Sequence, residues 1–145
     1  MLRRLLLPFL MVPLLGACAP ARPAPGITVE DGWARATAPG QSSAALYATI
    51  TSHGAPDTLT GVSSSVGQAM LHRNDDRGGI ARMRMVADLA IGADERVALA
   101  PGGTHVMVSG FGAPLKPGAP VTLTLRFAKA GERKVAIAVV APGAR

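Results

Sequence analysis

Short apolar runs separated by turn residues constrain the fold of this chain more than any other feature of its sequence. The runs span residues 27–37, 44–52, 57–65, 68–74, 80–86, 96–100, 105–111, 121–127 and 134–140. Several of them alternate apolar and polar side chains, as half-buried β-strands do. No segment of helical length carries a sustained apolar stripe at helical spacing. The pattern predicts an all-β domain, a Greek-key β-sandwich or barrel of about eight or nine strands.

The N-terminal segment is typical of an export signal. Arg3 and Arg4 precede an apolar run that is too short to span a bilayer, and small residues end it. Residues 15–18, Leu-Gly-Ala-Cys, resemble a bacterial lipobox, in which the cysteine becomes the lipidated first residue. We therefore expect a lipoprotein signal peptide at 1–17, lipidated Cys18 with a Pro/Ala-rich tether at 18–26, and a β domain at 27–145.

This N-terminus predicts a periplasmic or cell-envelope protein, anchored to the membrane through a lipid on Cys18. The alternative is an ordinary signal peptide with a stray cysteine. Because Cys18 is the only cysteine, the domain can form no intrachain disulfide. It also has no thiolate for a blue-copper electron-transfer site.

Charge and composition argue against two other classes of protein. The formal net charge of +6 falls by two when Arg3 and Arg4 leave with the signal peptide, and the remaining cations are scattered. Since aromatic residues make up only 3% of the chain, we expect no nucleic-acid partner. The serines at 63–65 lack the glycine frame of a nucleophile elbow. We therefore expect a protein that is not an enzyme.

Methionine and histidine occur in pairs that are two residues apart. The pairs are Met70 with His72, Met83 with Met85, and His105 with Met107, and the other two methionines lie in the signal segment. Residues two apart in a strand share one face of the sheet. Thioether sulfur and neutral imidazole are ligands that suit Cu(I). The alternative is that the methionines fill gaps in the core and the histidines are structural.

Four of these residues have a specific spacing. His72, Met83, His105 and Met107 form the pattern His-x10-Met-x21-His-x-Met, by which the sequence resembles the periplasmic PCu(A)C copper chaperone family. Residues 32–64 and 101–111 resemble further blocks of that family. The resemblance implies a cupredoxin-like β-sandwich in which the four residues are Cu(I) ligands. It also implies delivery of copper to cytochrome c oxidase, through its copper-site subunit or another copper chaperone of the assembly pathway.

Some positions depart from the family pattern and leave alternatives open. Arg73 stands beside His72 where the family often has Glu, so an extra cation would slightly disfavour a metal ion there. Met70 and Met85 are candidate additional donors. Residues 139–145 hold no His or Met, so we expect a single copper site. Function also has alternatives: a copper buffer or resistance lipoprotein without a dedicated client, or a structural lipoprotein that binds no metal.

The remaining histidine and two aromatic residues have simpler expected roles. His53 lies in a turn-rich stretch outside the motif, and we expect a solvated loop histidine. We expect Trp33 and Tyr47 to contribute packing.

Overall fold

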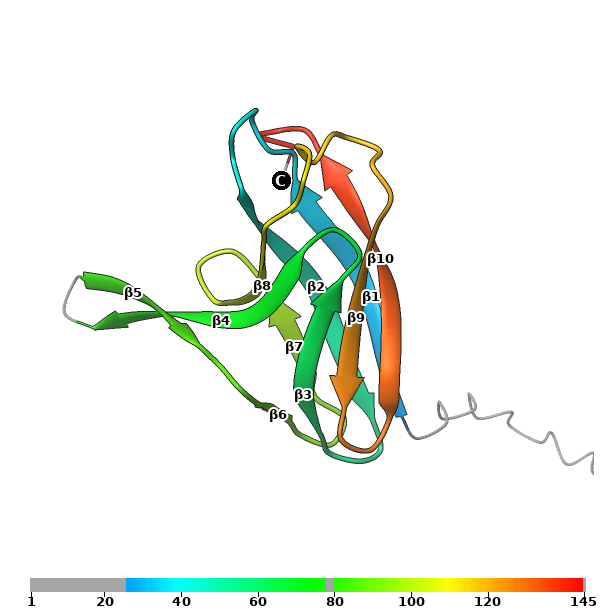
Figure 1. Ribbon diagram of the computed structural model, residues 1–145. Coiled ribbons are helices and arrows are strands. Elements are labelled where there is room, and N and C mark those ends of the chain that lie inside the picture. Colours follow the sequence, from blue (N-terminus) through cyan, green and yellow to red (C-terminus); the bar gives the residue numbers. More distant parts are fainter. Residues whose placement is uncertain (1–25, 78–79, 145) are drawn as a thin grey trace, which may run out of the picture.

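The computed structural model of the protein describes residues 26–77 and 80–144. The expected signal peptide, Cys18 and nearly all of the tether lie outside these residues. The described residues form ten strands (Figure 1). They are β1 (Gly26–Arg35), β2 (Ser43–His53), β3 (Asp57–Ser64), β4 (Gln68–Arg77), β5 (Ile80–Met85), β6 (Leu89–Ile91), β7 (Arg96–Leu99), β8 (Thr104–Ser109), β9 (Val121–Phe127) and β10 (Gly131–Val140). In this part of the chain, no helix is long and apolar enough to cross a membrane.

The all-β fold predicted from the sequence is confirmed. Each of the nine apolar runs overlaps one strand. The structure adds β6, which has three residues and is therefore too short to show an alternating pattern. His53 is the last residue of β2 rather than a loop residue, and its Nε2 lies 3.1 Å from Thr28 Oγ1.

The strands form one curled sheet. Their order is β5-β4-β8-β2-β1-β10-β9-β3-β6, and β7 pairs with β2 outside this path. Only the β1–β10 pair is parallel among the described pairs. The curl places the half that contains β2 and β8 across from the half that contains β9 and β3 (Figure 1). The two halves enclose the core as the two layers of a sandwich do.

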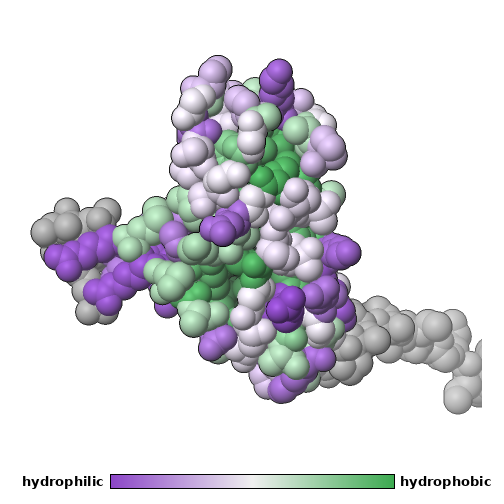
Figure 2. Space-filling view, in the orientation of Figure 1, coloured by the Kyte–Doolittle hydropathy of each residue, from purple (hydrophilic) through white to green (hydrophobic). Residues whose placement is uncertain are grey.

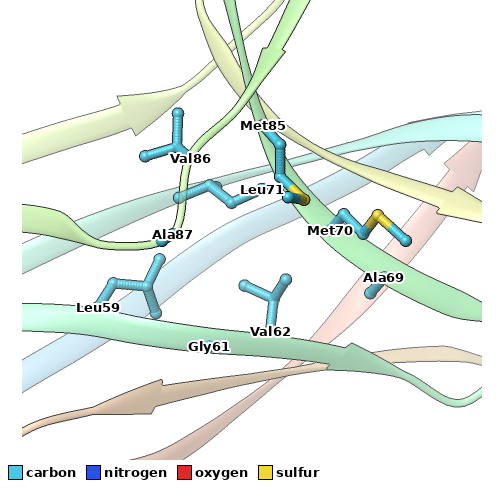
Figure 3. A pocket seen from close by; sticks show the side chains of 9 residues that line it. All are labelled: Leu59, Gly61, Val62, Ala69, Met70, Leu71, Met85, Val86 and Ala87. Carbon is cyan, nitrogen blue, oxygen red and sulfur yellow. The ribbon is translucent and has the colours of Figure 1, made fainter.

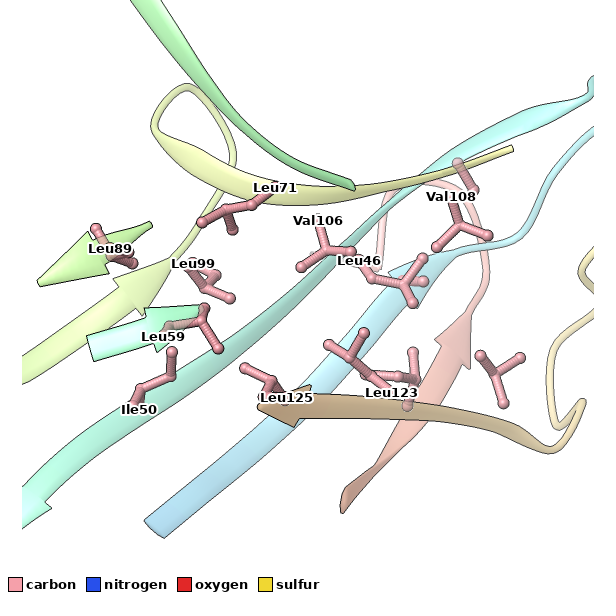
Figure 4. Packing of buried hydrophobic residues seen from close by; sticks show 14 of the residues in the cluster. Leu46, Ile50, Leu59, Leu71, Leu89, Leu99, Val106, Val108, Leu123 and Leu125 are labelled. Carbon is pink, nitrogen blue, oxygen red and sulfur yellow. The ribbon is translucent and has the colours of Figure 1, made fainter. Parts of the chain in front are cut away.

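Aliphatic side chains from both halves of the sheet fill this core (Figure 4). Leu46 and Val106 come from one half, and Leu59, Leu123 and Leu125 come from the other. All five are at most 1% exposed. Each buried side chain of this kind contributes about 1.5 to 3 kcal/mol through the hydrophobic effect. Burial of these alternating residues stabilises the strands that carry the candidate site on their opposite face.

A β-bulge in β1 decides which way Trp33 faces. Between Glu30, which is opposite Thr49, and Trp33, which is opposite Tyr47, β1 has one residue more than β2. Asp31 in this segment has a positive φ of 54°. A bulge of this kind shifts all following side chains to the other face of the strand. Because of the bulge, Trp33 lies on the same face of the sheet as Tyr47.

The bulge also requires a glycine at position 32. A Cβ atom added to Gly32 would lie 2.5 Å from the backbone oxygen of Ala136. Because that oxygen belongs to the neighbouring strand β10, it cannot rotate away as a side chain could. Close approach of β1 to β10 therefore depends on the absence of a side chain at Gly32.

Candidate metal centre

The methionine and histidine pairs lie on one outer face of strands β5, β4 and β8. His72 is directly opposite His105, and Met70 is directly opposite Met107, across the β4–β8 pair. On the other side of β4, Met85 of β5 is opposite His72. Residues that pair in this way share a face of the sheet. Leu71 and Val106, which lie between the paired residues of β4 and of β8, point into the core instead.

His72 is at the centre of this group. Its Nδ1 atom lies 3.0 Å from the sulfur of Met83. Its ring centroid is 6.2 Å from that of His105, and the two rings are nearly perpendicular, at 75°. When two imidazoles bind one ion through bonds of about 2.0 Å, the distance between their ring centroids is similar to the one seen here. Three of the four predicted ligands are therefore close together, and Met107 lies two residues from His105 on the same face.

His105 is held in one orientation. The residue is 4% exposed, and its Nδ1 donates a hydrogen bond to the carbonyl oxygen of Gly103 at 3.1 Å. The turn at Pro101–Gly102 positions this carbonyl, with Gly102 at a φ of 77°. A neutral imidazole that donates from Nδ1 has a lone pair on Nε2. The arrangement leaves Nε2 as the atom that could bind a metal ion.

Two aromatic side chains continue the row from His105. The ring centroids of Tyr47 and His105 are 6.4 Å apart. The ring centroids of Trp33 and Tyr47 are 4.4 Å apart, and the angle between the two ring planes is 37°. From the sequence we expected Trp33 and Tyr47 only to contribute packing, and their position beside the candidate site was not predicted. The β2–β8 pairing brings Tyr47 beside His105, and the β1 bulge brings Trp33 beside Tyr47. The sequence pattern reveals neither.

Exposure separates the methionines from ordinary core residues. Met70, Met83 and Met85 are 41%, 51% and 71% exposed, and they are the exposed large hydrophobic side chains of the described residues. A methionine that fills a gap in a core is buried. The gap-filling alternative therefore does not account for these three residues. Met107 is half-buried.

The donor set suits a soft ion better than a hard one. Within the described ranges, no group of three or more His, Cys, Asp and Glu side chains could hold a metal ion. The outer face of β5, β4 and β8 instead offers two imidazoles and several thioethers. Neutral nitrogen and sulfur ligands of this kind favour Cu(I) over Mg²⁺, Ca²⁺ or Mn²⁺.

Arg73 does not place its charge in this group. As the neighbour of His72 in a strand, Arg73 points to the opposite face of the sheet. There its Nε donates a hydrogen bond to Thr104 Oγ1 at 3.1 Å. Arg84 is directly opposite Arg73 in β5 and pairs with Asp75 at 3.7 Å. The expected repulsion between Arg73 and a metal ion at His72 is therefore weakened by distance and by the sheet between them.

The domain is all-β and carries neutral, soft donor atoms on one outer face of its sheet. It therefore falls in the class of β-sandwich proteins with a candidate site for a soft metal ion. Sequence comparison then gives the family. The model of the LpqE-like family, described as "Putative lipoprotein LpqE-like", matches residues 27–139. The chain belongs to this family.

Comparisons with individual proteins agree with this assignment. The chain is 31% identical over 124 residues to "Putative lipoprotein Lxx21020" of Leifsonia xyli subsp. xyli (strain CTCB07), which covers 85% of this chain and 75% of that protein. Among solved structures, the copper-bound PCuAC domain from PmoF2 matches with a TM-score of 0.67 and 31% identity, over 82% of this chain and 97% of that domain. The Cu(I) form of DR1885 from Deinococcus radiodurans matches with a TM-score of 0.57 and 33% identity, over 86% of this chain and 82% of that one.

These structural matches confirm the cupredoxin-like fold and the resemblance to PCuAC domains. They do not test the spacing motif itself. The assignment of His72, Met83, His105 and Met107 as ligands therefore stays a prediction.

Proposed function

We propose that this chain is an extracytoplasmic Cu(I)-binding metallochaperone, with His72, Met83, His105 and Met107 as the ligands of its cargo. The observation that carries the proposal is the convergence of His72 with Met83, at 3.0 Å, and with His105, on one face of the sheet. The similarity to copper-bound and Cu(I) PCuAC domains supports copper as the ion.

The four ligands differ in how firmly the fold holds them, and this difference suits transfer. His105 is 4% exposed and is fixed by its hydrogen bond to Gly103. Met83 is 51% exposed on the β4–β5 hairpin. A ligand from a partner can displace an exposed thioether more easily than a buried imidazole. We therefore propose that Met83 is exchanged first and that His105 releases copper last.

We propose delivery to the copper centres of cytochrome c oxidase. The immediate partner would be the copper-site subunit of the oxidase or another copper chaperone of the assembly pathway. The resemblance to the PCu(A)C family supports this client. The lipoprotein relative supports a lipid anchor at Cys18, which would hold the domain at the membrane surface in the periplasm or cell envelope. The proposed role is binding and transfer of a metal ion rather than catalysis.

A competition titration tests the metal-binding part of the proposal. The full chain carrying Cys18→Ser, which removes the only thiol, is titrated anaerobically with Cu(I) against a chromophoric chelator. We expect one tightly bound ion, and we expect His105→Ala to lose it. A chain that takes up no Cu(I) would contradict the proposal and favour the structural lipoprotein.

A deletion strain tests the client. We expect loss of the protein to lower the copper content and activity of cytochrome c oxidase, and the wild-type chain but not His105→Ala to restore both. Normal oxidase together with increased sensitivity to copper would instead indicate a copper buffer or resistance protein without a dedicated client.

A further inference from the structure

Two exposed methionines, Met70 and Met85, are not needed for the proposed ligand set. Both line an apolar groove between the β4–β5 hairpin and β3 (Figure 3). Leu59 and Val62 of β3 form one wall of this groove, and Leu71 and Val86 form part of the other. Figure 2 shows hydrophobic side chains gathered in this region of the surface.

The pairing register brings Met70 and Met85 within reach of one another. Met85 is directly opposite His72, and Met70 precedes His72 by two residues on β4. The two methionines are therefore diagonal cross-strand neighbours on one face, at a typical separation of about 7 to 8 Å that long side chains can bridge. Two sulfur atoms that share one ion lie within about 4.6 Å of each other, twice a metal–sulfur bond of about 2.3 Å. Two flexible methionine side chains at diagonal positions can satisfy this distance.

The surroundings of the two sulfur atoms favour a soft ion. None of the residues that line the groove is charged, and none is a histidine. Met70 and Met85 remain 41% and 71% exposed, so an ion from solvent has access to both. The thioethers are therefore the metal-binding groups among the side chains of the groove, and they favour Cu(I).

We infer that Met70 and Met85 form a second, weaker thioether site for Cu(I) at the rim of the groove. The inference rests on the proposed function, because the second site would exchange the same cargo. It is weaker because it offers two side-chain donors where the proposed primary site offers four. Met70 is directly opposite Met107, so an ion that leaves Met107 meets Met70 next. The second site would therefore lie directly beside the primary site, across the β4–β8 pair.

Methionine methyl NMR tests the inference residue by residue. The full chain carrying Cys18→Ser is labelled with ¹³C at the methionine methyl groups and titrated with Cu(I) under anaerobic conditions. Ag(I) serves as a redox-inert probe in a parallel titration. Single Met→Leu variants assign the signals. We expect the first equivalent to shift Met83 and Met107, and the second to shift Met70 and Met85.

Two variants give the matched comparison. The double variant Met70→Leu/Met85→Leu changes exposed positions to a side chain of similar volume, so it should fold and bind the first equivalent normally but lose the second. Met83→Leu should weaken the first equivalent and leave the response of Met70 and Met85 in place. Circular dichroism and the thermal midpoint check that each variant is folded.

The outcomes separate the inference from the proposed function. If Met83 and Met107 respond while Met70 and Met85 stay silent through two equivalents, or if all of them shift together in the first, a distinct second site is ruled out while the primary site stands. If only Met70 and Met85 respond, the second site stands and the proposed primary site is wrong. If no methyl signal responds to either ion, both are overturned.

Discussion

The Nδ1 atom of His72 lies 3.0 Å from the sulfur of Met83, across the β4–β5 hairpin. Ten residues separate the two in the sequence, and Met83 is opposite Asn74 rather than His72 in the ladder. Their contact is therefore a diagonal one between neighbouring strands, which the long methionine side chain can bridge. The hairpin alone brings together a nitrogen and a sulfur donor. The site then needs only β8 to supply His105 and Met107.

Replacement of single methionines by leucine should separate metal binding from packing. Met107→Leu and Met83→Leu nearly conserve volume, so each should change the free energy of unfolding by less than about 1.5 kcal/mol. If both sulfurs are ligands, each variant should weaken Cu(I) binding by an order of magnitude or more. Urea unfolding and a Cu(I) competition titration measure the two effects. Equal Cu(I) affinities for the wild type and both variants would show that neither sulfur is a ligand.

Removal of the cysteine should separate the anchor from the copper site. Cys18→Ser should release the protein from the membrane fraction, because lipidation requires the cysteine sulfur. It should leave the Cu(I) affinity unchanged, because none of the proposed ligands lies near the N-terminal segment in sequence. Membrane fractionation and the competition titration check the two halves. Weaker copper binding in this variant would identify Cys18 as a ligand.

The buried carboxylate Asp57 should make stability depend on pH. Burial raises the pKa of Asp57, but hydrogen bonds from the backbone N–H groups of Thr58, Ala130 and Lys129 lower it, and the net pKa is below its ordinary value. The stabilisation is therefore present above the unfolded pKa of about 3.9 and is lost as the pH falls through the lower folded pKa. Asp57→Asn should destabilise the protein at pH 7, and the difference from the wild type should shrink in acid.

Thermal unfolding of both proteins over a pH series measures this effect. The asparagine variant is a close match in size and keeps one hydrogen-bond acceptor. A difference in stability that is the same at neutral and at acidic pH would show that the charge of Asp57 does not contribute.

Gly32 should tolerate no side chain. In Gly32→Ala the new Cβ would meet the backbone oxygen of Ala136 at 2.5 Å, and overpacking of this kind costs roughly 1 to 3 kcal/mol. Gly61→Ala is the matched control, because its Cβ would have its nearest neighbour at 3.9 Å. Urea unfolding monitored by Trp33, the single tryptophan, compares them. Equal destabilisation by the two changes would show that the contact between β1 and β10 does not restrict position 32.

The period-two pattern of the sequence was sufficient to predict most strands and the shared face of each methionine and histidine pair. It could not predict which pairs lie opposite one another. His72 meets His105 because β4 pairs with β8, and Tyr47 approaches His105 because β8 pairs with β2. Register between strands that are distant in sequence depends on packing of the whole sheet. The direction of Arg73, away from the candidate site, follows from strand alternation once β4 is known.

The β4–β5 hairpin projects from the body of the domain (Figure 1), while His105 is anchored in β8 against the core. An ion bound by both Met83 on the hairpin and His105 on the body would crosslink the projecting hairpin to the rigid sheet. The flexibility of the β4–β5 hairpin would then depend on whether copper is bound. A partner that contacts the hairpin could then distinguish the copper-loaded form from the empty form before any ligand is exchanged.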